Sequence, residues 1–248
     1  NIGSIKKIEE FEKKKKEIEI LCENIGYRPT KIFKYILNDN PKGVANEMRK
    51  QFDAIASNLK GKNIWKKTNS DKDYLENLIR SIEEFNVFVF EFVDRKKKKD
   101  AIINFDGFFI KPNLIAIKRQ QDFLKREIFT LMHEFAHYLL GDEEIDANVG
   151  EKIIENQNKT ETWCNEFSYY FLAGTFDDQL NEVSQATRNN EFHRDLIDEI
   201  SEKTHLSVLA LYTRFKINNK IVSNEYYRIY REILDSVTYV QATTLNST

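Results

Sequence analysis

The sequence predicts an α+β fold that is mostly helical, with a small antiparallel β-sheet packed on one of the helices. Three observations favour this fold class. Apolar residues recur at helical spacing along most of the 248 residues. The chain has only 8 Gly and 3 Pro, which is few for a turn-rich all-β protein. β-branched and aromatic residues gather in one stretch, between residues 86 and 117.

The first part of the chain is expected to be helical. A strong turn signal, Asn38 to Pro41, divides it, and a polar loop follows at residues 59–70. The expected helices, each with apolar residues on one side, cover residues 4–24, 29–37, 43–58 and 71–84.

The period of the apolar residues then changes from helical to strand-like. Strands are expected over residues 86–93, over 101–105 together with 107–110, and over 114–117, and their short connections predict antiparallel pairing. We also expect an extended substrate to add to the sheet edge at the last of these strands.

Helices resume after the sheet. One is expected over residues 122–140, with Gly141 as its C-cap, and a second over residues 160–172. An acidic loop, residues 142–160, is expected between them. Several short helices are expected after Asp177.

Composition excludes several classes of protein. With 38 basic and 40 acidic residues the formal net charge is -2, which excludes a strongly basic nucleic-acid coat and an acidic disordered chain. Two cysteines, Cys22 and Cys164, are too few for a disulfide framework and are typical of a reducing compartment. No apolar run is long enough to span a membrane and no signal peptide is recognisable, so we expect a cytoplasmic protein.

Residues 131–141, LMHEFAHYLLG, contain the pattern H-E-x-x-H. On a helix, His133 and His137 lie one above the other, so both imidazoles can bind one metal ion. Glu134 directly follows His133 and can act as general base on a water molecule at that ion. The pattern fixes only three positions and also recurs by chance. The metal interpretation is favoured because the chain has only four His, because the helix is amphipathic, and because a third ligand is available downstream.

Catalytic zinc takes three protein ligands and keeps one position open. A third histidine at the spacing H-E-x-x-H-x-x-G-x-x-H is absent, because Leu140 and Glu143 stand at the Gly and His positions. The third ligand is therefore expected to be a carboxylate. The loop after the helix offers the candidates Asp142, Glu143, Glu144 and Asp146.

The next helix offers better preorganised candidates. Glu161 shares a helix face with the small residues Cys164 and Ser168, which would let two helices approach closely. We rank Glu161 first and Glu166 second. Asn165 lies one turn beyond Glu161 and is expected to hydrogen-bond a ligand histidine.

Three blocks of this sequence resemble the ImmA/IrrE family of zinc metallopeptidases. They are the pair Gly107-Phe108, the segment REIFTLMHEFAH from Arg126 to His137, and ETWCNEFS from Glu161 to Ser168. Cys164 and Ser168 replace alanines that are usual in the family. Spacing and order agree across the three blocks, so we divide the chain into an N-terminal helical segment (residues 1–70), a zinc metallopeptidase core (71–176) and a C-terminal helical segment (177–248).

The resemblance implies a cytoplasmic, Zn²⁺-dependent peptide-bond hydrolase with a narrow protein substrate. In this family the substrate is a helix-turn-helix transcriptional repressor, cut in a stress, phage or mobile-element response. The chain begins at Asn1 rather than Met, which leaves room for an N-terminal DNA-binding domain.

Two other functions stay open at this point. One is a non-catalytic regulator that uses the metallopeptidase fold to bind a partner protein or DNA. The intact Glu134 argues against it, because a pure binding module has no need of the base. The other is a purely structural metal site, which would have four protein ligands.

Overall fold

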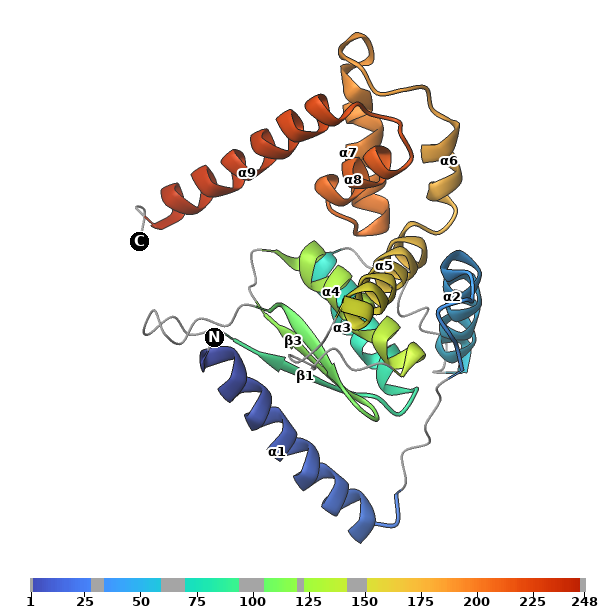
Figure 1. Ribbon diagram of the computed structural model, residues 1–248, viewed down its shortest axis with the longest axis vertical. Coiled ribbons are helices and arrows are strands. Elements are labelled where there is room, and N and C mark those ends of the chain that lie inside the picture. Colours follow the sequence, from blue (N-terminus) through green and yellow to red (C-terminus); the bar gives the residue numbers. More distant parts are fainter. Residues whose placement is uncertain are drawn as a thin grey trace. The chain divides into compact units, whose positions relative to one another are not determined.

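The chain forms two compact units, Asn1–Leu172 and Ala173–Thr248, shown in Figure 1. The computed structural model describes residues 2–27, 34–58, 70–93, 105–119, 123–141 and 151–245. None of the helices within these ranges has both the length and the apolar character that a membrane span requires.

The first unit combines helices with a three-stranded sheet. Its described elements are, in chain order, α1 (Ile2–Asn24), α2 (Pro41–Asn58), α3 (Asp71–Glu83), β1 (Phe88–Phe92), β2 (Gly107–Ile110), β3 (Leu114–Lys118), α4 (Leu124–Leu140) and α5 (Glu151–Ala173). The predicted α+β class, mostly helical with a small sheet packed on the H-E-x-x-H helix, is confirmed.

The sheet is mixed, with strand order β1-β3-β2, so the prediction of a wholly antiparallel sheet is wrong. The turn at residues 111–113 makes β2 and β3 antiparallel, as the short connection implies. The neighbour of β1, however, is β3 rather than β2, and the two run parallel. The path from β1 to β3 includes β2 and its connections, which is long enough to return the chain in the same direction. Because β3 is the central strand, it cannot be the edge that we expected to receive a substrate.

Two helix predictions also need correction. Residues 34–37, the described part of the predicted helix 29–37, are not helical, because the backbone N–H of Ile36 donates to the carboxylate of Asp39 (2.9 Å) in a turn. Helix α5 begins at Glu151, within the stretch expected to be an acidic loop. The polar composition of residues 151–159 concealed this part of the helix.

Helices cover both faces of the sheet. On one face, α4 packs on β2 and β3, and Phe109 meets Tyr138 of α4 edge to face at 5.9 Å between ring centroids. On the opposite face, Phe11 of α1 is 1% exposed and contacts the rings of Phe90, Phe92 and Phe108 (5.4–5.9 Å between centroids). Figure 1 shows α1 along the side of the sheet away from α4.

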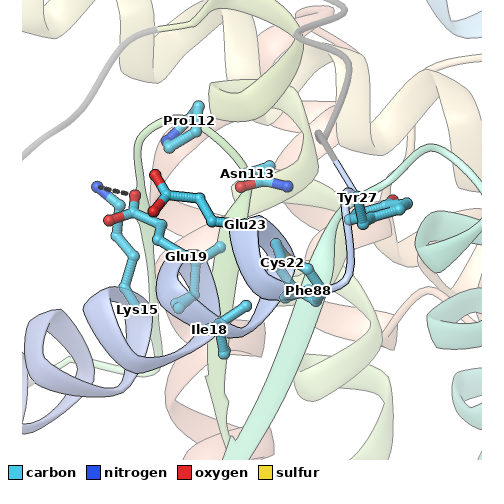
Figure 2. Close-up of a pocket in the computed structure, with 11 residues that line it drawn as sticks. Lys15, Ile18, Glu19, Cys22, Glu23, Tyr27, Phe88, Pro112 and Asn113 are labelled. Carbon is cyan, nitrogen blue, oxygen red and sulfur yellow. Dashed lines mark ion pairs between the residues drawn. The ribbon is translucent and has the colours of Figure 1, made fainter.

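The contact between α1 and the sheet is incomplete towards the C-terminal end of the helix. A cavity of about 530 Å³ remains there, and Figure 2 shows the side chains that line it. Its apolar wall includes Cys22, Phe88 and Leu114, and the ion pair of Lys15 with Glu19 (4.0 Å) also lines it.

The second unit is helical in its described residues. It contains α6 (Phe176–Glu182), the 3₁₀-helix η2 (Arg188–His193), α7 (Arg194–Thr204), α8 (Val208–Ile217) and α9 (Ser223–Leu245). Ser207 caps α8 by accepting from the backbone N–H of Ala210 (3.1 Å). Inside this unit, Arg214 of α8 and Asp177 of α6 form a buried ion pair (4.0 Å).

The contact of Phe11 with the sheet gives a stability prediction. Phe11→Ala should lower the free energy of unfolding of the first unit by about 3 kcal/mol, because it removes a fully buried ring from among three others. Ile20→Ala, on the same helix but 58% exposed, should change it by less than about 0.5 kcal/mol. Trp163 belongs to this unit, so urea unfolding followed by tryptophan fluorescence measures it. Equal effects of the two substitutions would show that α1 does not pack on the sheet through Phe11.

Candidate metal centre

Helix α4 fixes the H-E-x-x-H residues in place. Its core-facing residues Ile128, Leu131, Met132 and Phe135 are fully buried (0% exposed). The helix ends where Gly141 adopts a left-handed conformation (φ 64°), with its N–H donating to the carbonyls of the last turn. The predicted C-cap is therefore confirmed, and the helix that carries the motif is rigidly anchored.

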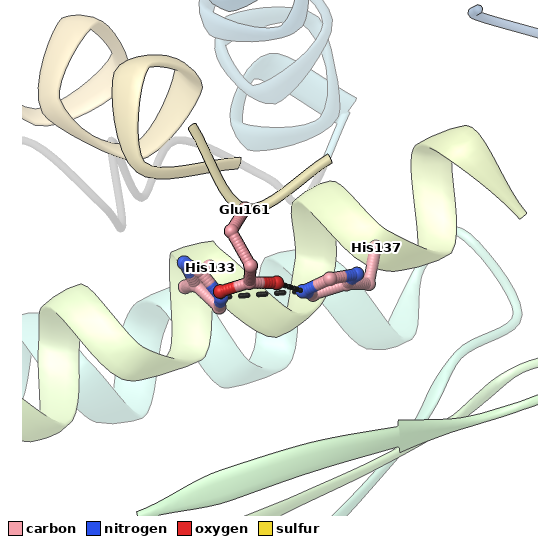
Figure 3. Close-up of side chains that lie close together, drawn as sticks. All are labelled: His133, His137 and Glu161. Atoms are coloured by element: carbon pink, nitrogen blue, oxygen red, sulfur yellow. Dashed lines mark hydrogen bonds and ion pairs between the residues drawn. The ribbon is translucent and has the colours of Figure 1, made fainter. Parts of the chain in front are cut away.

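Three potential ligand atoms converge beside this helix, as Figure 3 shows. The Nε2 atoms of His133 and His137 are 3.2 Å apart. Glu161 reaches across from α5, with one carboxylate oxygen 3.2 Å from His133 Nε2 and the other 2.9 Å from His137 Nε2. The structure thus brings together the two histidines and the carboxylate that we ranked first.

The spacing of these atoms fits a metal ion. In a tetrahedral zinc site with ligand bonds of about 2.0–2.1 Å, neighbouring ligand atoms are about 3.3 Å apart. The separations of 2.9–3.2 Å come close to this value. Two imidazole nitrogens and a carboxylate oxygen also form a common ligand set of catalytic zinc.

The three side chains differ in their access to solvent. The side chain of His137 is 1% exposed, whereas those of His133 and Glu161 are 15% and 31% exposed. The group therefore lies at the surface on one side, where water or a substrate can approach it.

Packing of α5 on its neighbours holds Glu161 in position. Trp163 stacks on Phe167 at 5.6 Å, and its indole N–H donates to the backbone carbonyl of Asp39 (2.8 Å). Phe167 in turn contacts Phe135 of α4. The guanidinium of Arg49 on α2 donates to the carbonyl of Phe171, near the end of α5. Aromatic contacts and two hydrogen bonds to the backbone thus fix the helix that supplies the carboxylate.

Two opposing influences act on the pKa of Glu161. Partial burial favours the neutral acid and would raise the pKa. Hydrogen bonds and charge from His133 and His137 outweigh burial and bring the pKa well below its ordinary value. Glu161 is therefore a carboxylate at neutral pH, which is the form that binds a metal ion.

Glu134 is buried (7% exposed). Its Cγ lies against the backbone of Gly107 at the start of β2. Glu134 is therefore adjacent in sequence to His133 without being one of the three clustered side chains.

The other predicted residues are placed as follows. Asn165 is exposed, and among the described residues no hydrogen bond joins it to His133 or His137, so its supporting role stays a prediction. Glu166 is half-buried and lies outside the cluster. The loop carboxylates Asp142, Glu143, Glu144 and Asp146 lie outside the described residues.

Two contacts of the site were not foreseen from the sequence. One is the hydrogen bond from Trp163 to Asp39, which joins residues far apart in the chain. The other is the close approach of Gly107 to α4. A glycine inside a strand pattern signals such an approach, and Gly107 could have been found in that way.

A profile of the IrrE N-terminal-like domain, the Peptidase M78 family, matches residues 82–216. This is more than half of the chain. The chain belongs to this family. It therefore carries a metallopeptidase domain, and the resemblance to the ImmA/IrrE family is confirmed.

The chain was also compared with curated proteins and with solved structures. A comparison with curated proteins gave no match. Among solved structures, a Mycobacterium tuberculosis transcriptional regulator aligns with 12% identity and a TM-score of 0.40. The alignment covers 71% of this chain and 46% of the regulator, so this chain spans less than half the length of that protein.

The geometry of the M78 site predicts how substitutions affect metal binding. His133→Ala, His137→Ala and Glu161→Ala should each weaken Zn²⁺ binding by more than about 100-fold, because even the loss of a supporting neighbour of a ligand costs about 10- to 100-fold. Glu166→Ala and Glu134→Gln should change the affinity by less than about threefold. Competition with a chromophoric chelator measures all five variants.

Two outcomes of this titration would contradict the assignment. Parent-like affinity in Glu161→Ala would move the third ligand to the carboxylates between Asp142 and Asp146. Loss of zinc from Glu134→Gln, as complete as from the histidine variants, would show that Glu134 is itself a ligand.

Proposed function

We propose that this chain is a zinc-dependent endopeptidase that cuts a helix-turn-helix transcriptional repressor in a stress, phage or mobile-element response. The observation that carries the catalytic part is the convergence of His133, His137 and Glu161 beside Glu134 in a member of the M78 family. The choice of substrate rests on the resemblance of the three sequence blocks to ImmA/IrrE proteins.

The three clustered side chains would hold the ion, with His137 as the innermost ligand. Zinc bound there supplies a Lewis acid for the scissile carbonyl and lowers the pKa of a water molecule towards about 7. Partial exposure of His133 and Glu161 supports a site with an open position, as catalysis requires and a closed structural site does not allow.

Glu134 would be the general base and then the general acid. In this role its carboxylate takes a proton from the attacking water and later delivers it to the leaving amide nitrogen. His133 and His137 would bind the ion, which leaves the proton transfers to Glu134. General catalysis of this kind contributes about 10²- to 10⁴-fold to the rate.

An extended substrate would pair with β2. Within the described residues, β1 and β2 are the edges of the sheet, and β2 is the edge whose first residue, Gly107, lies against Glu134. A peptide that adds to this edge gains main-chain hydrogen bonds without a demand on its sequence. The scissile bond would then pass close to the general base.

Selectivity must come from surfaces other than the metal centre, because an unselective peptidase would damage its own cell. We place the docking surfaces on the helices before Asn86 and after Asp177. The buried cysteines Cys22 and Cys164 are both thiols rather than halves of a disulfide, which supports the reducing cytoplasm as the compartment.

Co-expression with a candidate substrate tests this function. The parent chain and the Glu134→Gln variant would each be produced together with the helix-turn-helix repressor encoded beside the gene, under inducing conditions. Intact-mass measurement should show a single cut of the repressor by the parent and at least a 100-fold slower cut by Glu134→Gln. The purified parent should leave unfolded casein nearly uncut, lose activity with a chelator, and regain it with Zn²⁺.

An uncut repressor in both samples would contradict the proposed substrate. If repressor-driven transcription still responded to the intact chain, the alternative of a non-catalytic regulator would replace proteolysis. Equal cutting by the parent and Glu134→Gln would contradict the assigned base.

A further inference from the structure

Gly107 stands where strand β2 passes beneath the motif helix. Side chains alternate between the two faces of a strand. Its neighbour Phe108 contacts Phe11 on the α1 side of the sheet, so position 107 faces α4. Gly107 pairs with Ile117 of the central strand β3, which is fully buried (0% exposed). This end of β2 is therefore held between α4 and the middle of the sheet.

The space above Gly107 is too small for any side chain. A Cβ atom built there would lie 2.6 Å from Thr130 Cγ2, 3.0 Å from Glu134 Cγ and 3.2 Å from the backbone carbonyl oxygen of Ala116. Optimal contacts between carbon atoms are about 3.5–4.0 Å. Any residue other than glycine would therefore force its neighbours to move.

The neighbours differ in how readily they can move. Ala116 belongs to the central strand and is fully buried (0% exposed), so its backbone is fixed. Thr130 and Glu134 are one turn apart on α4, whose core-facing residues Leu131 and Phe135 are also fully buried. The side chains of Thr130 and Glu134 can rotate at lower cost than α4 can shift as a whole.

We propose that Gly107 is a positioning residue for Glu134. Because Gly107 has no side chain, Glu134 Cγ can pack against its Cα. This contact sets the direction in which the carboxylate extends from α4. None of the three atoms nearest to an added Cβ belongs to His133, His137 or Glu161. A larger residue at position 107 would thus misplace the base and leave the metal-binding side chains where they are. This inference rests on the proposed role of Glu134 and adds the residue that orients it.

The test uses variants that separate crowding of Glu134 from crowding of Thr130. Gly107→Ala creates both contacts. The double variant Gly107→Ala/Thr130→Ser lacks Thr130 Cγ2 and keeps the 3.0 Å contact with Glu134, and Thr130→Ser alone gives its baseline. Gly43→Ala in α2 is the matched control, because a Cβ there meets only Asn40 Cβ at 3.9 Å. Glu134→Gln is the reference for loss of the base.

Four measurements are made on the zinc-loaded chains. Crystal structures locate the Glu134 side chain. Competition with a chelator gives the zinc affinity, and melting curves give thermal stability. Cleavage of a proteome-derived peptide library, followed by mass spectrometry, gives hydrolysis rates without a known substrate, and kcat and KM follow for a peptide that is cut.

We expect the double variant to regain the thermal stability that Gly107→Ala loses, to bind zinc within threefold of the parent, and to show Glu134 in a different rotamer. Its kcat should be about 10- to 100-fold lower with KM unchanged, because a displacement of about 1 Å at a catalytic group has effects of this size. Gly43→Ala should match the parent in Glu134 rotamer, zinc affinity and hydrolysis rate, and it should melt no lower than the parent, because Ala is favoured over Gly in a helix.

A parent-like Glu134 rotamer in the double variant, or recovery of the full rate together with stability, would overturn the inference. Failure of the proposed function looks different: the parent and Glu134→Gln would then cut the library equally. In that case the crystal structures still decide whether Gly107 positions the Glu134 side chain.

Discussion

The contact between α4 and α5 is the constraint on which the site depends. The spacing of His133 and His137 on one helix is enough to bring their imidazoles together, but two imidazoles are an incomplete ligand set. The third potential ligand, Glu161, lies beside the histidines because two contacts position α5. Phe167 packs on Phe135, and the indole N–H of Trp163 donates to the backbone carbonyl of Asp39. The same packing keeps the two Nε2 atoms 3.2 Å apart and each of them within 2.9–3.2 Å of a Glu161 oxygen. Such crowding is favourable when a cation or protons are shared among them.

The sheet has a second, separate function in this site. It supports α4 from below through Phe109 and Tyr138, and at Gly107 it approaches the helix so closely that only hydrogen fits. In the proposed function, metal binding and proton transfer therefore depend on different neighbours. The ligands depend on α5, whereas Glu134 depends on β2. This division explains how one short motif can place two kinds of chemistry on adjacent residues without interference.

Sequence patterns predicted what depends on local periodicity. The spacing of apolar residues predicted most of the helices, and the i, i+4 relation predicted that His133 and His137 lie together. Glu161 was ranked first because it shares a helix face with small residues, and the structure places it at the histidines. The parallel pairing of β1 with β3 and the anchor from Trp163 to Asp39 were not predicted. Both join residues that are distant in the chain, and no local pattern specifies which distant partner is chosen.

The central claim is that three side chains bind one metal ion and leave a coordination position open. X-ray absorption at the zinc edge, combined with anomalous diffraction from crystals of the zinc-loaded chain, measures this directly. The account predicts one zinc per chain with two imidazole nitrogens, one oxygen from Glu161 and at least one solvent oxygen. Four protein ligands, or a zinc ion located away from His133 and His137, would contradict it.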